Sequence, residues 1–428
     1  MTSKNEIKKR FFNSLKRGTG EAILIAKENP SIDFSNHIIN GVLKNYAYDG
    51  QSEPERATYI YDLISLSNQK EKIRKALFQA LKTEKEDTWT LTHLFALAKN
   101  FAENGDKEAR KAIYKRFLNN RIECSDWVGY SEILELDGFN GLVYIAEKYG
   151  KLMKRDPEVW EDDMIISHFQ DENKNINVKE ELEVVAQGNE YVKIYLDRVK
   201  QIKETRNANY QEREERQKTY ENIIDEILDK PRLPYKKYKQ LTETEIKLVA
   251  DALVKEQKED NIEKFLFVFT HNQFPLDSTF ILELAKQKKS LNIRDRAIDA
   301  LEHLKSDKIR EFALEKISNN KSPRLYLNIL VANYKEGDSK LLTQLVNKTN
   351  NEWFIESYAC SATHIFEKNK TPECKEPLEA LYKKMNCGLH RKYLVEIMIE
   401  NNVLSDKLRE ELIFDSNLET RELIKNCR

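Results

Sequence analysis

The sequence predicts an all-α protein, an α-solenoid built from antiparallel helix pairs. Only 12 of its 428 residues are glycine and 9 are proline, well below average usage of roughly 7% and 5%, and turn-rich β folds depend on both. Apolar residues recur every three or four positions almost throughout, which is the period of one helix face. Charged residues make up 33% and apolar residues 40% of the chain. This composition excludes collagen-like and membrane-spanning classes.

Two helix hairpins can be placed in the first third of the chain. Over 54–81, two apolar stripes flank the polar break SLSNQK, and over 87–118 two more flank ENGDK. Both breaks have the length of a helix–helix turn. Asp87 and Thr88 are candidates for the N-cap of a helix, and Gly105 is expected to end one in the left-handed conformation.

The clearest internal repeat lies at 292–317. Ile293-Arg294, Ala297 and Leu301 recur sixteen residues later as Ile309-Arg310, Ala313 and Ile317. A Gly-Asp turn at 337–338 then opens another helix.

An Asp, an apolar-Arg pair, and Ala and Leu on one helix face together resemble the HEAT family of α-helical repeats. The resemblance covers roughly 290–350 and more weakly 54–118, where Asp106, Ala109-Arg110 and Ile113 repeat the pattern. It implies a HEAT- or armadillo-like superhelix that offers a long concave surface. The alternative is an irregular all-α bundle of two domains.

A change in composition near the middle divides the chain. Residues 203–218 carry charges on nearly every face, which is typical of a helix that bridges solvent, and Pro231 and Pro234 interrupt helical structure. We therefore expect an N-terminal helical repeat array over 1–200, a charged connecting helix and Pro-containing linker over 201–234, and a C-terminal HEAT-like array over 235–428. The alternative is that the long helix packs back on the array as one of its members.

Cysteine usage and charge predict the compartment. An odd number of cysteines, 5, without a dense framework indicates reduced thiols. Residues 1–18 carry charges but no apolar run, so we expect no secretory signal. The formal net charge of −1 gives no global attraction to nucleic acid or membranes. We expect a cytoplasmic protein that does not bind membranes.

The sequence contains no catalytic or phosphate-binding signature of the type GxxxxGK[ST], GxGxxG, GxSxG or HExxH. An enzyme is therefore not favoured, and we assign no catalytic residue and no cofactor. The sharpest chemical constellation is Cys360, His364, Cys387 and His390. Two Cys and two His can form a tetrahedral zinc site, but buried thiols without metal are common. We assign no metal ligand.

Residues 156–190 form an acidic stretch with an aromatic residue inside it. Trp160 stands beside Glu161, Asp162 and Asp163. One interpretation is a docking surface for a basic partner with Trp160 as the anchor. A hard-cation site and a solvated helix face are the alternatives.

Two basic stretches lie at 230–239, where tyrosines are interleaved, and at 286–296. Lysines contact phosphates and tyrosines stack on bases in nucleic-acid-binding proteins. The alternative is a linker with solvated lysines, together with arginines that pair between helices as is typical of the repeat. The lysines that mark this candidate surface are Lys236, Lys237, Lys286, Lys288 and Lys289.

The absence of catalytic motifs and the balanced charge favour a non-catalytic scaffold or adaptor, which binds a protein partner through its concave surface. The alternative is a nucleic-acid-binding HEAT-like protein, such as a repair enzyme of the DNA glycosylase type. That resemblance implies basic residues on the DNA backbone, and Trp or Tyr with an acid at the lesion. No position of this chain matches those roles by motif.

Overall fold

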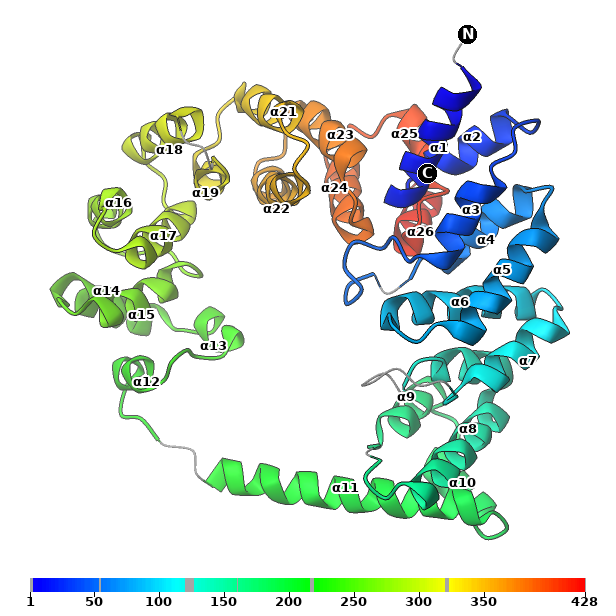
Figure 1. Ribbon diagram of the computed structural model, residues 1–428. Helices are drawn as coiled ribbons and strands as arrows, with labels where there is room; N and C mark the ends of the chain where they lie inside the picture. Colours follow the sequence, from blue (N-terminus) through cyan, green and yellow to red (C-terminus); the bar gives the residue numbers. More distant parts are fainter. Residues whose placement is uncertain are drawn as a thin grey trace. The chain divides into compact units, whose positions relative to one another are not determined.

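The computed structural model describes residues 3–53, 55–119, 127–159, 161–215, 219–319 and 323–427. These residues form 26 α-helices and two 3-10 helices, and no strand occurs among them (Figure 1). The prediction of an all-α fold is therefore confirmed. Within the described ranges, no helix has the length and apolar character that a membrane crossing requires.

The helices form two compact units. Unit 1 comprises Met1–Gln217 and Glu410–Arg421, and unit 2 comprises Lys218–Arg409 and Glu422–Arg428. The first boundary falls inside the segment 201–234, which we expected to connect two arrays. The segment 410–421, which we expected in the C-terminal array, instead belongs to unit 1.

Unit 1 begins with eleven helices. They are α1 (Lys4–Arg17), α2 (Glu21–Glu28), α3 (Ser35–Leu43), α4 (Ala57–Leu66), α5 (Lys70–Thr83), α6 (Thr88–Glu103), α7 (Lys107–Arg116), α8 (Tyr130–Arg155), α9 (Met164–Glu172), α10 (Val178–Ala186) and α11 (Glu190–Glu215). The two expected hairpins correspond to α4–α5 and α6–α7. Five of these helices, α1 and α3 to α6, each contact the next helix and the next but one, as α3 does with α4 and α5.

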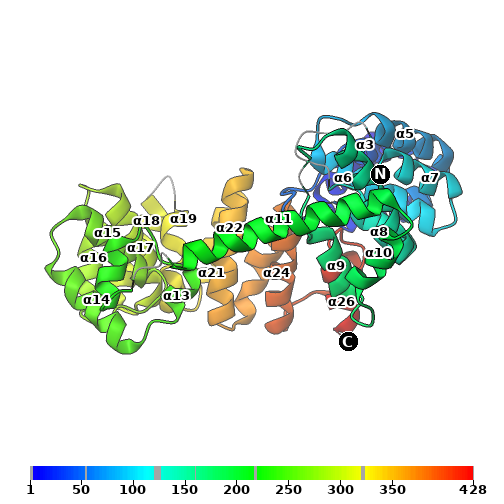
Figure 2. The same ribbon diagram turned by 90° about the horizontal axis from the view of Figure 1, so that it is seen from below.

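The long helix α11 is continuous and straight (Figure 2). Its first half packs along α8 and buries Val192, Tyr195 and Val199. This half of α11 is therefore part of the core of unit 1. The helix continues to Glu215, and residues 203–207, in the segment expected to connect the two arrays, are exposed. The connecting role of 201–234 stays a prediction.

The segment 410–421 packs on the first helices of unit 1. The backbone N–H of Ser416 donates to the carbonyl of Gly18 at 2.8 Å, and Arg421 pairs with Asp62 at 2.8 Å. Gly20 permits the close approach, because a Cβ atom there would lie 1.9 Å from the carbonyl oxygen of Glu411. Unit 1 is therefore assembled from both ends of the described chain.

Unit 2 contains the remaining helices. They are α12 (Ile223–Asp229), α13 (Tyr235–Lys239), α14 (Glu243–Lys255), α15 (Glu259–Phe269), α16 (Ser278–Lys286), α17 (Leu291–Ala300), α18 (Asp307–Asn319), α19 (Arg324–Leu327), α20 (Leu330–Asn333), α21 (Asp338–Lys348), α22 (Glu352–Lys368), α23 (Lys375–Lys384) and α24 (Gly388–Glu400). The 3-10 helices are η1 (Leu301–His303) and η2 (Pro372–Cys374), and α25 (Asp406–Leu412) and α26 (Leu418–Asn426) carry most of 410–421.

One side of unit 2 is formed by α15, α17, α19, α22 and α24, which contact one another in that order. We call this set the α15–α24 row. Figure 1 shows α14, α16, α18, α21 and α23 on the opposite side of the unit. The row carries Phe267, Arg296, Arg324, Trp353 and Cys360, whereas Tyr235 and Lys239 lie on α13 and Arg232 precedes it.

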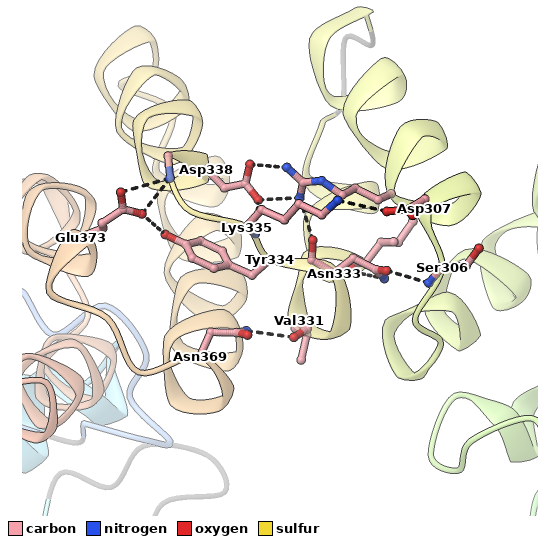
Figure 3. Close-up of polar contacts among 12 residues, drawn as sticks. Ser306, Asp307, Val331, Asn333, Tyr334, Lys335, Asp338, Asn369 and Glu373 are labelled. Carbon is pink, nitrogen blue, oxygen red and sulfur yellow. Dashed lines mark hydrogen bonds and ion pairs between the residues drawn. The ribbon is translucent and has the colours of Figure 1, made fainter.

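Arginine–aspartate pairs link neighbouring helices in both units. Arg310 of α18 holds Asp338 at the start of α21 through two hydrogen bonds of 2.6 and 2.8 Å. Figure 3 shows this link and the adjoining one, in which Glu373 accepts from the backbone N–H of Gly337 at 2.9 Å. In unit 1, Arg74 holds Asp106 in the same manner.

Asp106 has a second role in unit 1, because it also caps α7 by accepting from two backbone N–H groups. Arg110, four residues later, pairs with Asp137. Asp106 therefore links α7 to α5, and Arg110 links α7 to α8.

The two copies of the internal repeat at 292–317 bury equivalent apolar residues, but their arginines have different partners. Both copies bury their apolar positions. Arg310 reaches the next helix, whereas Arg294 bonds to the adjacent Asp295 at 2.7 Å. The carboxylate next to Arg294 in sequence satisfies the guanidinium locally, so this copy lacks the Arg–Asp link between helices.

Candidate binding surface

The short helix α13 carries the interleaved tyrosines of the first basic stretch. Pro234 starts the helix, and Tyr238 is buried with its hydroxyl accepting from the backbone N–H of Leu233 at 3.0 Å. Asn272 donates to the carbonyl of Tyr238 at 3.0 Å and so ties the helix to the end of α15. Tyr235, one turn earlier, keeps 60% of its surface exposed.

Two arginines from the two basic stretches meet on one aromatic ring. The guanidinium carbon of Arg232 lies 5.0 Å from the ring centroid of Phe267, and that of Arg296 lies 4.8 Å from it. Lys239 lies over the ring of Tyr235, at 4.7 Å. A cation over an aromatic face is held by the ring quadrupole and needs no carboxylate.

A histidine completes this arrangement. The ring of His271 lies 5.0 Å from that of Tyr235 and 5.2 Å from that of Phe267, edge to face in both cases. Its Nε2 is buried and has no hydrogen-bond partner within the described part of the chain. We call this set the Phe267 cluster. Its members are Arg232, Tyr235, Tyr238, Lys239, Phe267, His271 and Arg296.

The charge of the Phe267 cluster is positive. Burial lowers the pKa of His271, and the nearby positive charges of His303, Lys239 and Arg296 lower it further. Among the residues that the structure describes, no carboxylate lies within ion-pairing distance of Arg232 or Lys239. Arg296 has one carboxylate, Asp299, at 3.8 Å. The cluster therefore combines exposed aromatic surface with cations that have few internal counter-ions.

A second cation–aromatic pair lies farther along the α15–α24 row. The guanidinium carbon of Arg324 on α19 is 3.5 Å from the ring centroid of Trp353 on α22. Trp353 is 50% exposed and also contacts the ring of Phe354. Trp and Arg are among the residue types that dominate binding energies in protein interfaces.

The five lysines singled out from the sequence fall into two groups. Lys237 pairs with Glu226, and Lys286 pairs with Glu283 at 2.9 Å. The other three are exposed and have no ion pair within the described residues. These three are Lys236, Lys288 and Lys289. The basic stretches meet through Arg232 and Arg296, and not through the chosen lysines.

The acidic residues of the predicted docking surface face α11. Asp163 pairs with Lys203 at 2.7 Å, and both Asp162 and Asp163 bond to Arg206, at 3.3 and 3.1 Å. The hydrogen bond from Lys203 lowers the pKa of Asp163. Glu161 is buried, and Trp160 lies outside the described residues. This acidic docking surface stays a prediction.

The Cys and His residues of the zinc alternative are only partly brought together. Cys360 and His390 meet across α22 and α24 at 3.4 Å, whereas His364 faces Glu302 at 3.6 Å and Cys387 is buried. In the part of the chain that the structure covers, no group of three or more His, Cys, Asp or Glu is arranged to hold a metal ion.

Sequence reasoning did not identify Phe267 and His271 as site residues, because the apolar run FLFVF at 265–269 is typical of a buried helix end. Phe265 and Phe269 are indeed buried, but Phe267 is half exposed. The signal for its role is a basic stretch on either side of it in the sequence, at 230–239 and at 286–296. No known protein family matches the chain, and no curated protein matches it in sequence.

Proposed function

We propose that the chain is a cytoplasmic scaffold with a HEAT-like α-solenoid architecture, and that it binds a protein partner. The contacts of helices with the next and the next but one and the Arg–Asp pairs between helices support the repeat architecture. In a solenoid, one helix of each pair lines the concave binding surface. We assign that role in unit 2 to the α15–α24 row.

The partner segment that suits this surface is acidic and carries an apolar or aromatic side chain. The observation that carries the proposal is the meeting of Arg232 and Arg296 on the ring of Phe267. Carboxylates of a partner would replace the missing internal counter-ions, since Arg binds carboxylates through paired hydrogen bonds. The exposed ring of Tyr235 then covers the apolar side chain of the partner.

The test is binding of a fluorescein-labelled acidic peptide, poly-glutamate with interspersed phenylalanine, followed by fluorescence anisotropy. Arg232→Gln and Tyr235→Ala should each weaken binding about tenfold, which corresponds to ~1.4 kcal/mol. Lys247→Gln is the matched control, because Lys247 is exposed on α14 and lies outside the cluster. Equal binding by all variants would refute the assignment.

A second candidate function is binding of single-stranded nucleic acid. It is favoured by Tyr235, whose ring is 60% exposed beside Lys239, because stacking rings next to cations hold single strands. Fluorescein-labelled oligo(dT) in the same assay distinguishes the two partners. Preference for oligo(dT), with an affinity that falls steeply with added salt, would favour this candidate over the acidic peptide.

A further inference from the structure

Three side chains with complementary chemistry meet between α22 and α24. Cys360 Sγ lies 3.4 Å from His390 Nε2, and the other ring nitrogen of His390, Nδ1, lies 3.5 Å from Glu356 Oε1. Glu356 and Cys360 are four residues apart on α22, so both project from one face of that helix. His390 approaches them from the first turn of α24.

The order of these groups is carboxylate, imidazole, thiol. His390 Nδ1 is buried and makes no hydrogen bond within the described residues, so Glu356 acts on it through its charge at 3.5 Å. A negative charge at that distance favours the tautomer with hydrogen on Nδ1, which leaves Nε2 to accept the thiol proton. The contact with Cys360 raises the pKa of His390, burial opposes that rise, and the charges of Cys360 and Glu356 add to it. The surroundings therefore favour the protonated imidazole that forms when His390 removes a proton from sulfur.

Cys360 also differs from the other described cysteines in access and surroundings. It is half exposed, whereas Cys374 and Cys387 are buried. Burial raises the pKa of the Cys374 thiol to about 11, which keeps that sulfur in its unreactive protonated form. Cys427 is half-buried, like Cys360, and the structure gives it no imidazole contact. It is therefore a matched reference thiol.

The environment of Cys360 includes a further ring. Tyr393, one turn after His390, is 40% exposed, and its ring lies edge to face with the imidazole at 6.4 Å. This ring provides apolar surface close to His390 and Cys360. An acyl donor with a small apolar or aromatic group suits such surroundings.

We propose that Cys360, His390 and Glu356 form a nucleophilic site that takes an acyl group from an activated ester or thioester. Cys360 is the nucleophile, His390 is the general base and Glu356 is the positioning residue. This activity goes beyond the binding function proposed above and does not depend on it.

The reaction balances without a further reactant. His390 Nε2 removes the proton from Cys360, and the sulfur attacks the carbonyl carbon of the donor. The new C–S bond replaces the bond to the leaving oxygen or sulfur, which takes the proton from His390. Water then attacks the thioester with His390 again as base, the C–S bond breaks, and the acid and the free thiol are released.

The test uses the full chain and para-nitrophenyl acetate, with release of para-nitrophenolate and the mass of each cysteine peptide as readouts. We expect Cys360 to be acetylated at least about tenfold faster than Cys427. Cys360→Ser should abolish the fast phase, His390→Gln should slow it at least about tenfold, and Cys427→Ser should leave it unchanged. Far-UV circular dichroism verifies that each variant is folded.

The role of Glu356 has its own readout. Glu356→Gln should slow acetylation several-fold, and Glu356→Asp should restore part of the rate, because a carboxylate would again face Nδ1. A purely structural Glu356 would change the melting temperature and leave the rate of the folded variant unaltered. Acetylation of Cys360 no faster than Cys427, or at an undiminished rate in folded His390→Gln, would overturn the proposal.

Discussion

Charged side chains have different partners in two regions of the molecule, the acidic residues of unit 1 and the Phe267 cluster of unit 2. Asp162 and Asp163 are bonded to Lys203 and Arg206 of α11. Arg232 and Lys239, by contrast, rest on aromatic rings. Both regions were candidate partner surfaces in the sequence, yet only the second has cations that lack internal counter-ions within the described residues.

This difference distinguishes charged residues that stabilise the fold from charged residues that remain available to a partner. A carboxylate that is half buried and paired contributes to folding, so its loss lowers the free energy of unfolding. A cation on an exposed ring contributes little to folding and stays available to an anionic partner. The predictions below test this contrast, from the largest expected change in stability to the smallest.

The largest effect is expected at the buried ion pair of unit 1, Arg56 and Glu53, whose side chains are only 2% and 7% exposed. Arg56→Met should lower the free energy of unfolding by about 3–5 kcal/mol, because Glu53 would lose a principal counter-ion while buried. Denaturant unfolding measures the change. Arg155→Met, on an exposed arginine at the end of α8, is the control and should alter stability by under ~0.5 kcal/mol.

The next effect is expected at Glu132 of unit 1, where nearby groups offset the burial of the carboxylate only weakly. Burial raises the pKa of Glu132 to about 7, above the usual value of 4.5. The protonated form is therefore favoured by folding, so its contribution is present below pH 4.5 and is lost as pH rises through 7. Glu132→Gln should stabilise the protein at pH 8.5 by about 3 kcal/mol and by almost nothing at pH 4.

The control for Glu132 is Glu135→Gln, because Glu135 is half exposed and pairs with Lys99. It should show no gain at high pH. Equal stability of Glu132→Gln and the parent chain at pH 8.5 would mean that folding does not raise the pKa of Glu132.

An intermediate effect is expected at the acidic surface itself. Asp163→Asn removes the charge that pairs with Lys203 and Arg206, and should lower the free energy of unfolding by ~1 kcal/mol. The pKa of Asp163 is depressed, so this difference should be full above pH 3.8 and vanish in stronger acid. Asp171→Asn is the exposed control. Equal stabilities of Asp163→Asn and the parent chain would leave Asp163 as a candidate residue of the acidic docking surface.

Local features of the fold could be predicted from the sequence, and contacts between distant segments could not. Asp87 caps α6 as expected, and Gly105 is left-handed with φ of +90°, because both depend only on adjacent backbone. The pairing of Asp163 with Lys203 depends on how α11 is rotated against α9. No spacing within one helix encodes that rotation.

The candidate sites illustrate the same limit. The same-face relation of Glu356 and Cys360 follows from their spacing of four, but the approach of His390 depends on the packing of α24 on α22. Arg232 and Arg296 lie far apart in the sequence and meet only because α13 and α17 both border the end of α15. The two basic stretches could be identified, but not the ring that joins them.

The smallest change in stability is expected in the Phe267 cluster. Arg232→Gln removes a cation at 5.0 Å from Phe267, and such exposed contacts contribute about 0.5–1 kcal/mol. Unfolding should therefore shift less than for Asp163→Asn, while binding of the acidic peptide weakens about tenfold. A loss of stability near that of Arg56→Met would show that Arg232 stabilises the fold and is not held available for a partner. The contrast between the two surfaces would then fail, and with it the reason for placing a partner on the α15–α24 row.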